Sequence, residues 1–156
     1  MSEDNIILSS VAEDSILGTI KKMLGLDLEY NAFDQDIIVF LNSGFMKLQQ
    51  IGVGPVSGFS IDGVGQRWEE FLPTGVMIEG AKTYLYLGVK MMFDPPGNSY
   101  VMEAMKQEKE ELEWRLREQA EFYPGDGSKK GYFEQLAAAE EADNDTDSEA
   151  AETEGG

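Results

Sequence analysis

Two adjacent prolines, Pro95 and Pro96, limit the possible folds most strongly, because neither residue can continue an α-helix. On both sides of this pair, apolar residues recur every three or four positions, which is the spacing of one helical face. The pattern predicts a helix over about residues 79–93 and a longer helix over about residues 99–119. The chain has to turn sharply between them.

One face of the helix before the prolines is apolar. It consists of Ala81, Tyr84, Leu85, Gly88 and Met92. Because glycine has no side chain, Gly88 would let a neighbouring backbone come close to this face. We therefore expect this helix to pack inside the domain.

The helix after the prolines has a thin apolar stripe, which consists of Val101, Met105, Leu112 and Leu116 and is interrupted at Glu108. Most other positions carry Glu, Lys, Arg or Gln. A stripe this narrow is only partly buried in its own domain. The pattern predicts that this helix also lies against another chain.

A short helix is expected near the start of the chain. Asp14 or Ser15 can cap its first turn, and Gly25 can end it after Leu24. Lys21 lies near its C-terminal end, where a positive charge suits the helix dipole. So short a helix needs tertiary packing to persist.

A second helix should begin near Asp34 or Asp36 and end near Gly52, because Ile38, Leu41, Phe45 and Leu48 follow helical spacing. The Asp-Gln-Asp pattern at its start can hold a divalent metal in some enzymes. Both acids fall where the helix begins, so helix capping is the expected role. We predict no metal site here.

The stretch over residues 53–65 is rich in glycine and is interspersed with apolar residues. Such a pattern indicates a loop or a short extended hairpin instead of a helix. One helical turn is expected over residues 68–72. The fold class is therefore mainly α: a small bundle of about four helices with a glycine-rich extended loop or short hairpin.

The charge is strongly acidic and unevenly distributed. The chain has 30 acidic and 12 basic residues, a net charge of -18. Residues 121–156 carry 11 of the acids and 2 of the bases. We expect a flexible arm over residues 1–13, a helical domain over 14–122 and a disordered acidic tail over 123–156. Within the tail, Tyr132, Phe133 and Leu136 could form a short helix on a partner.

The composition excludes several functions. Clustered Lys and Arg are absent, which argues against general binding to nucleic-acid backbones or to anionic membranes. No run approaches the roughly 20 apolar residues of a membrane span. There is no cysteine and no histidine, so thiolate chemistry and the commonest general base are missing. We predict no catalytic site, no cofactor and no metal, and a chain that is cytosolic when it is made.

Several stretches together resemble the head–tail connector proteins of long-tailed bacteriophages, also called head-completion or adaptor proteins. The pairing of FDPPGNSY with EELEWRL is the most specific part. The resemblance covers roughly residues 12–120, and the acidic tail lies outside it. The matching stretches are residues 36–42, 50–55, 68–71, 82–87, 93–100 and 110–116.

The resemblance implies a mostly helical virion protein of the neck. It implies subunits that form a ring under the portal, twelvefold because the portal is, which extends the DNA channel and presents a surface to the next neck or tail component. An acidic chain beside that channel would repel DNA and let it slide. We predict that contacts with the portal or with neighbouring subunits involve Val53, Phe59, Ile61, Val101, Met105, Leu112, Trp114 and Leu116.

Two other functions remain open. The chain could be a different neck or scaffold component with a similar helical body. It could also be an acidic regulator that mimics DNA and occupies a host DNA-binding protein. The second alternative fits the acidity, but half of the negative charge lies after residue 120 and the rest is interleaved with Lys and Arg.

Overall fold

The structure is a computed structural model, and it describes residues 14–72 and 77–122. Within these ranges it contains helices and loops but no strand, which confirms the mainly α fold class. The expected N-terminal arm and acidic tail lie outside the described residues. The helices are α2 (Ile16–Met23), α3 (Asp34–Gln50), α4 (Trp68–Phe71), α5 (Met77–Phe93) and α6 (Ser99–Phe122).

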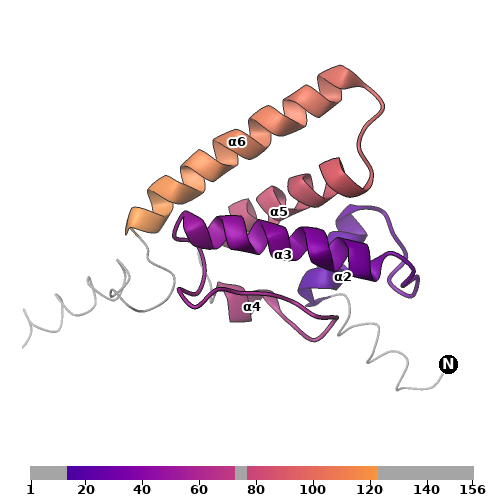
Figure 1. Ribbon diagram of the computed structural model, residues 1–156, viewed down its shortest axis with the longest axis horizontal. Coiled ribbons are helices and arrows are strands. Elements are labelled where there is room, and N and C mark those ends of the chain that lie inside the picture. The colour runs from indigo at the N-terminus through magenta and orange to yellow at the C-terminus, as the bar shows by residue number, and fades with distance from the viewer. Residues whose placement is uncertain (1–13, 73–76, 123–156) are drawn as a thin grey trace, which may run out of the picture.

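Helix α5 is the central element, because both α3 and α6 pack against it (Figure 1). The short α2 contacts α3 and α5, and Trp68 and Phe71 of α4 are also buried, so all five described helices contribute to one apolar core. The largest side chains that are almost fully buried in this core include Phe45, Phe71 and Tyr84. The turn at Pro95 and Pro96 reverses the chain so that α6 can return along α5, as the sequence predicted.

Helix α2 begins and ends at the expected signals. The Ser15 hydroxyl accepts a hydrogen bond of 2.9 Å from the Gly18 backbone N–H, and Gly25 follows the last turn with φ of 76°. The start of α2 is also tied to a distant segment. The Ile16 backbone N–H donates to the Gln66 carbonyl at 3.0 Å, beside an isolated antiparallel bridge between Ser15 and Arg67.

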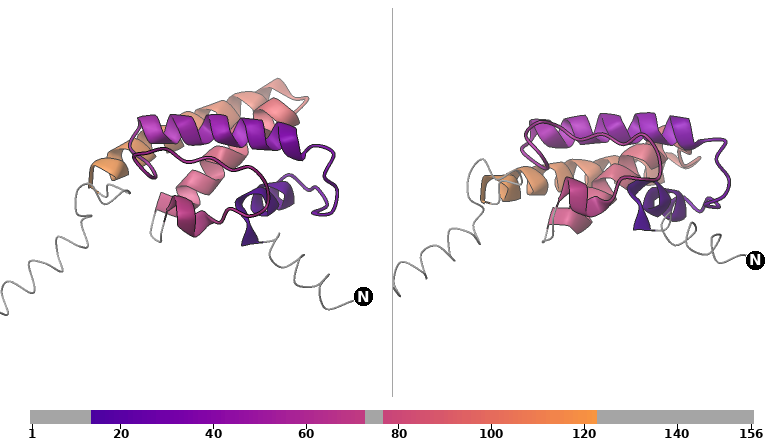
Figure 2. Two further views of the ribbon diagram at one scale, coloured as in Figure 1. Left: turned by 60° about the horizontal axis from the view of Figure 1, so that its bottom comes forward. Right: turned by 90° about the horizontal axis from the view of Figure 1, so that it is seen from below.

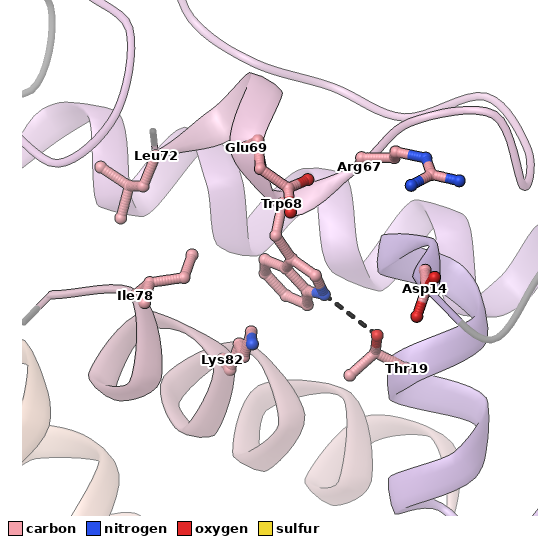
Figure 3. A pocket seen from close by; sticks show the side chains of 8 residues that line it. All are labelled: Asp14, Thr19, Arg67, Trp68, Glu69, Leu72, Ile78 and Lys82. Atoms are coloured by element: carbon pink, nitrogen blue, oxygen red, sulfur yellow. Dashed lines mark hydrogen bonds between the residues drawn. The ribbon is translucent and has the colours of Figure 1, made fainter. Parts of the chain in front are cut away.

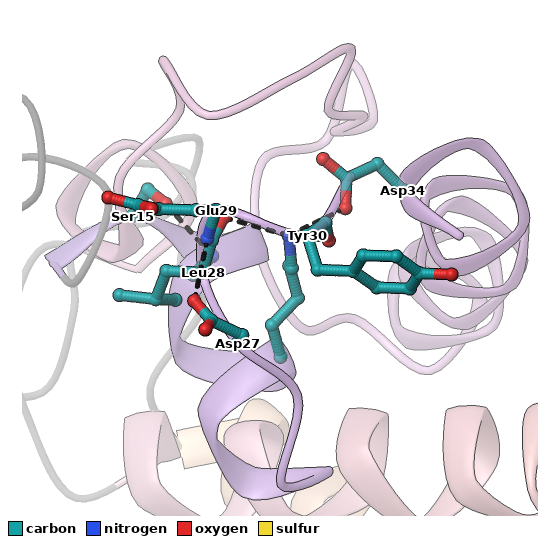
Figure 4. A network of polar contacts seen from close by, with 8 residues as sticks. Ser15, Asp27, Leu28, Glu29, Tyr30 and Asp34 are labelled. Atoms are coloured by element: carbon teal, nitrogen blue, oxygen red, sulfur yellow. Dashed lines mark hydrogen bonds and ion pairs between the residues drawn. The ribbon is translucent and has the colours of Figure 1, made fainter. Parts of the chain in front are cut away.

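The start of α3 differs from the sequence prediction. Phe33 is the N-cap residue and no side chain caps the helix, so the capping role expected for Asp34 and Asp36 is wrong. Asp34 instead forms an ion pair of 2.8 Å with Lys21, whose side chain is only 2% exposed. The Lys21 ammonium also donates to the carbonyl of Leu28 at 3.0 Å and of Tyr30 at 2.8 Å (Figure 4). Lys21 thus holds the α2–α3 connection on α3.

The glycine-rich segment is a loop that runs along α3 (Figure 2). Asn42 on α3 clamps it: its side-chain amide donates to the Ile61 carbonyl at 2.9 Å and accepts from the Ile61 N–H at 2.8 Å. Phe59 from the loop joins Phe45 and Phe71 in an aromatic cluster, with ring centroids 4.8–5.4 Å apart. These contacts anchor the loop to the domain's packed interior.

Gly54 brings the loop backbone against this aromatic cluster. It has φ of 91°, which side-chain-bearing residues rarely adopt. A Cβ atom added there would lie 2.3 Å from Cε2 of Phe71. Both the turn and the close approach therefore require glycine.

The buried face of α5 agrees with the predicted one at Ala81, Tyr84 and Leu85. Met92 was wrongly placed on it, because its side chain is 67% exposed. Gly88 does allow a close approach, but the neighbour is a side chain and not a backbone. A Cβ added at Gly88 would lie 3.3 Å from Cε of Lys109 on α6.

Helix α6 begins after Asn98, whose side-chain oxygen accepts a hydrogen bond of 2.8 Å from the Tyr100 N–H. Of the predicted apolar stripe, Leu116 is buried and Leu112 packs against the core. Val101 is 46% exposed and lies off this inner face. The stripe continues to Ala120, which is buried.

Candidate assembly surfaces

The described residues offer no obvious reactive centre. In residues 14–72 and 77–122, no group of three or more His, Cys, Asp or Glu side chains could hold a metal ion. None of the helices in these ranges is both long and apolar enough to cross a membrane. Several apolar side chains of the described helices are instead exposed to solvent.

Some of the residues predicted to contact partners are packed in the domain's own core, and others are at least partly exposed on α6. Val53, Ile61 and Leu116 are at most 3% exposed, and Phe59 and Leu112 pack against the core. A rigid domain cannot present the first three to a partner. Met105 is half-buried on α6, while Val101 and Trp114 on the same helix are 46% and 56% exposed. The loop residues Val53, Phe59 and Ile61 are therefore not part of one exposed surface with the α6 residues.

Helix α3 carries exposed apolar residues that the sequence reasoning missed. Val39 is 63% exposed and Met46 is 52% exposed. They are seven residues apart, which is two helical turns, so they share one face. We call Val39 and Met46 the α3 patch. The sequence could have predicted this patch, because Val39 and Met46 are apolar but lie outside the buried stripe that contains Leu41 and Phe45.

A second exposed group is aromatic and lies where the α2–α3 connection meets the end of α5. Tyr30 and Phe33 have ring centroids 5.6 Å apart, and Phe33 and Phe93 are 5.2 Å apart. Tyr30 is 51% exposed and Phe33 is 39% exposed. This group depends on the Lys21 contacts, because Lys21 binds the Tyr30 carbonyl.

A polar pocket of about 420 Å³ lies between α2, α4 and α5 (Figure 3). The Trp68 indole N–H donates to the Thr19 hydroxyl at 3.0 Å, and the Lys82 ammonium lies 5.4 Å from the Trp68 ring centroid. Lys82 also pairs with Glu79 at 3.2 Å. The polar groups of this pocket contact one another, so the pocket is part of the packing between the helices. Its lining residues are Asp14, Thr19, Arg67, Trp68, Glu69, Leu72, Ile78 and Lys82.

The contact between α5 and α6 contains a buried tyrosine. The Tyr84 hydroxyl donates to a carboxylate oxygen of Glu113 at 3.1 Å, and the Lys109 ammonium lies 4.2 Å from the Tyr84 ring centroid. Burial, and then the negative charge and hydrogen bond of Glu113, raise the pKa of Tyr84 well above its usual value of 10.0. Burial, and then the nearby charge of Lys47, lower the pKa of Lys109.

The raised pKa of Tyr84 predicts a loss of stability in alkali. Above pH 10.0 the unfolded chain releases this proton while the folded chain keeps it, so the free energy of unfolding falls as pH rises. The contribution approaches about 1.4 kcal/mol per pH unit. Urea unfolding of the native protein and of Tyr84→Phe should show this fall only in the native protein.

The matched control is Tyr100→Phe, because the Tyr100 ring is 86% exposed. This variant should keep the native pH profile. A stability difference between the native protein and Tyr84→Phe that is the same at about pH 9 and about pH 11 would contradict the assignment.

The fold and its surfaces define a small helical protein whose exposed apolar residues, rather than a reactive centre, are its distinctive feature. A family model described as phage connector protein matches residues 16–122, which is more than half of the chain. The chain therefore belongs to the phage connector protein family, and this confirms the resemblance found in the sequence. No curated protein and no solved structure matches it.

Membership of this family indicates a structural protein of the phage neck, in a family that is typically non-enzymatic. The match ends at Phe122, so it covers the described helices but not the acidic segment after them.

Proposed function

We propose that this chain is a subunit of a ring at the head–tail interface of the virion. Assembled in the host cytoplasm, the ring would sit beneath the portal with the portal's twelvefold symmetry, extend the DNA channel and provide the docking surface for the next neck or tail component. The membership of the phage connector family supports this proposal.

The observation that carries the proposal is the presence of exposed apolar residues on two separate helices. The α3 patch lies on α3, while Val101 and Trp114 lie on α6, and α5 packs against both helices. A ring made of identical subunits needs two different surfaces on each subunit, one for each neighbour. A twofold dimer needs only one. The α3 patch and the exposed Trp114 on α6 provide two such surfaces, which favours head-to-tail assembly.

The charge supports a position beside DNA that does not involve tight binding. A net charge of -18 would repel the phosphate backbone and favour sliding. On α6 the acids alternate with bases: Arg115 pairs with Glu111 at 2.6 Å and Arg117 approaches Glu113 at 3.6 Å. A DNA mimic would need uninterrupted rows of negative charge, so this pattern favours the connector over the regulator.

Trp114→Glu on the full chain tests the proposal. Placing a charge at a packed interface tryptophan should weaken assembly at least about tenfold, because such residues contribute most of the binding energy in interfaces. The measurement is native mass spectrometry and electron microscopy of the chain, alone and mixed with its portal protein. Rings should form in the native sample and be depleted in the variant.

Gln35→Glu is the matched control, since it adds the same charge at an exposed position in the first turn of α3. It should assemble like the native chain. If the native chain stays monomeric both alone and with the portal, the ring proposal is wrong. If Trp114→Glu assembles normally, α6 is not a subunit interface.

A further inference from the structure

A narrow apolar groove of about 90 Å³ lies where α3, α5 and α6 meet. Leu85 and Gly88 on α5 and Gly44 on α3 contribute to its lining. We call it the α3–α6 groove. Its volume suits one large side chain instead of a whole helix. Its lining residues are Phe40, Ser43, Gly44, Lys47, Tyr84, Leu85, Gly88, Met92 and Lys109.

Two lysines, Lys47 from α3 and Lys109 from α6, line this groove. Neither forms an ion pair with another residue that the structure describes. Burial, and then the charge of Lys47, lower the pKa of Lys109, while the carboxylates of Glu113 and Glu110 act in the opposite direction. In a chain with a net charge of -18, two lysines that line one apolar pocket form a site for an apolar side chain flanked by carboxylates.

We propose that the α3–α6 groove binds residues 132–141 of the same chain. This segment reads YFEQLAAAEE, in which apolar Tyr132, Phe133 and Leu136 are followed by alanines and flanked by Glu134, Glu140 and Glu141. One of the apolar side chains enters the groove, and the carboxylates face Lys47 and Lys109. This inference does not rest on ring formation.

The end of α6 lies within reach of the groove. A Cβ added at Gly52, just after α3, would be 3.4 Å from Cβ of Ala120, so the C-terminal ends of α3 and α6 lie side by side (Figure 1). Lys47 is less than one helical turn before the end of α3, about 5 Å away along its axis. Residues 123–131 can span about 30 Å when extended, which is ample for residue 132 to reach the groove.

Binding within one chain is favoured over binding to a second copy. A short tether gives the segment an effective concentration in the millimolar range at its own groove. Such a concentration exceeds that of other copies in a dilute sample. The chain's own segment is therefore the expected occupant, and exchange between copies would join two different chains.

Zero-length carbodiimide crosslinking of the full chain, followed by mass spectrometry, tests this proposal. Crosslinks should join Lys47 or Lys109 to Glu134, Glu140 or Glu141. Phe133→Ser combined with Leu136→Ser should reduce their yield at least about fivefold, because the apolar anchor is lost while every carboxylate remains. These substitutions lie outside the described core, and circular dichroism checks that the helices persist.

Lys106 provides the internal control, because it lies on α6 one turn before Lys109 and is exposed. Its crosslinks to residues 132–141 should be rare and unaffected by the double substitution. Undiminished Lys47 and Lys109 crosslinks in the variant would indicate unspecific charge attraction and overturn the proposal. In a mixture of ¹⁴N- and ¹⁵N-labelled chains, crosslinks that join the two labels would overturn binding within one chain.

Discussion

Replacing Lys21 with methionine is expected to lower the free energy of unfolding by about 3 kcal/mol, the scale for removing one partner of a buried ion pair. Methionine fills a similar space but donates no hydrogen bond. The carbonyls of Leu28 and Tyr30 and the carboxylate of Asp34 would then lose the cation that now binds all three. Urea unfolding followed by circular dichroism measures the loss.

Lys22→Met is the matched control for this substitution. Lys22 is exposed on the same helix, so its replacement should change the free energy of unfolding by less than about 0.5 kcal/mol. The double variant Lys21→Met with Asp34→Leu should recover about 1 kcal/mol, because it removes the carboxylate that would be left without its cation. A loss below about 1 kcal/mol for Lys21→Met would show that the buried ammonium contributes little.

Gly54→Ala is expected to lower the free energy of unfolding by at least about 3 kcal/mol. A side chain at φ of 91° costs about 1–2 kcal/mol, and crowding a packed interior costs a further 1–3 kcal/mol. The crowding is severe here, because the new methyl group would lie 2.3 Å from the Phe71 ring, which packs on Phe45 and Phe59. Thermal or urea unfolding measures the effect.

Gly25→Ala separates the two causes. Gly25 has φ of 76°, but a Cβ added there would meet nothing within 4 Å. This variant should therefore lose only about 1 kcal/mol, which reflects backbone strain alone. Equal losses at Gly25 and Gly54 would mean that the aromatic cluster moves aside without cost.

The helices could be predicted because their signals are local. Ser15 and Gly25 delimit α2, and Pro95 and Pro96 end α5, within one or two residues of the observed bounds. Such signals act through the backbone of neighbouring residues and need no knowledge of the tertiary fold. The number and order of the main helices follow from them.

Contacts between distant residues could not be predicted in the same way. Asn42 and Ile61 are 19 residues apart, and no spacing rule connects an amide on a helix to a loop backbone. The sequence predicted Lys21 in the last turn of the helix. The direction of its side chain depends on where the chain turns back to place the carbonyls of Leu28 and Tyr30. Tertiary packing decides both contacts.

The interface residues raise a related difficulty. An apolar residue in a glycine-rich loop has the same appearance in the sequence whether it packs on its own domain or on a partner. Val53 and Ile61 pack on their own domain, as their burial shows. Trp114, Val39 and Met46 are exposed, so they are the better candidates for contact with other subunits.

The link between the start of α2 and the segment before α4 has a consequence for biosynthesis. The Ile16 backbone N–H donates a hydrogen bond to the Gln66 carbonyl, and the Thr19 hydroxyl accepts one from the Trp68 indole N–H. Trp68 lies 49 residues after Thr19 in the sequence. A ribosome that has released only α2 and α3 has not yet supplied these partners, nor the Phe71 ring that covers Phe45. The nascent chain therefore keeps apolar surface uncovered until α4 and α5 emerge, and such surface is prone to aggregation during that interval.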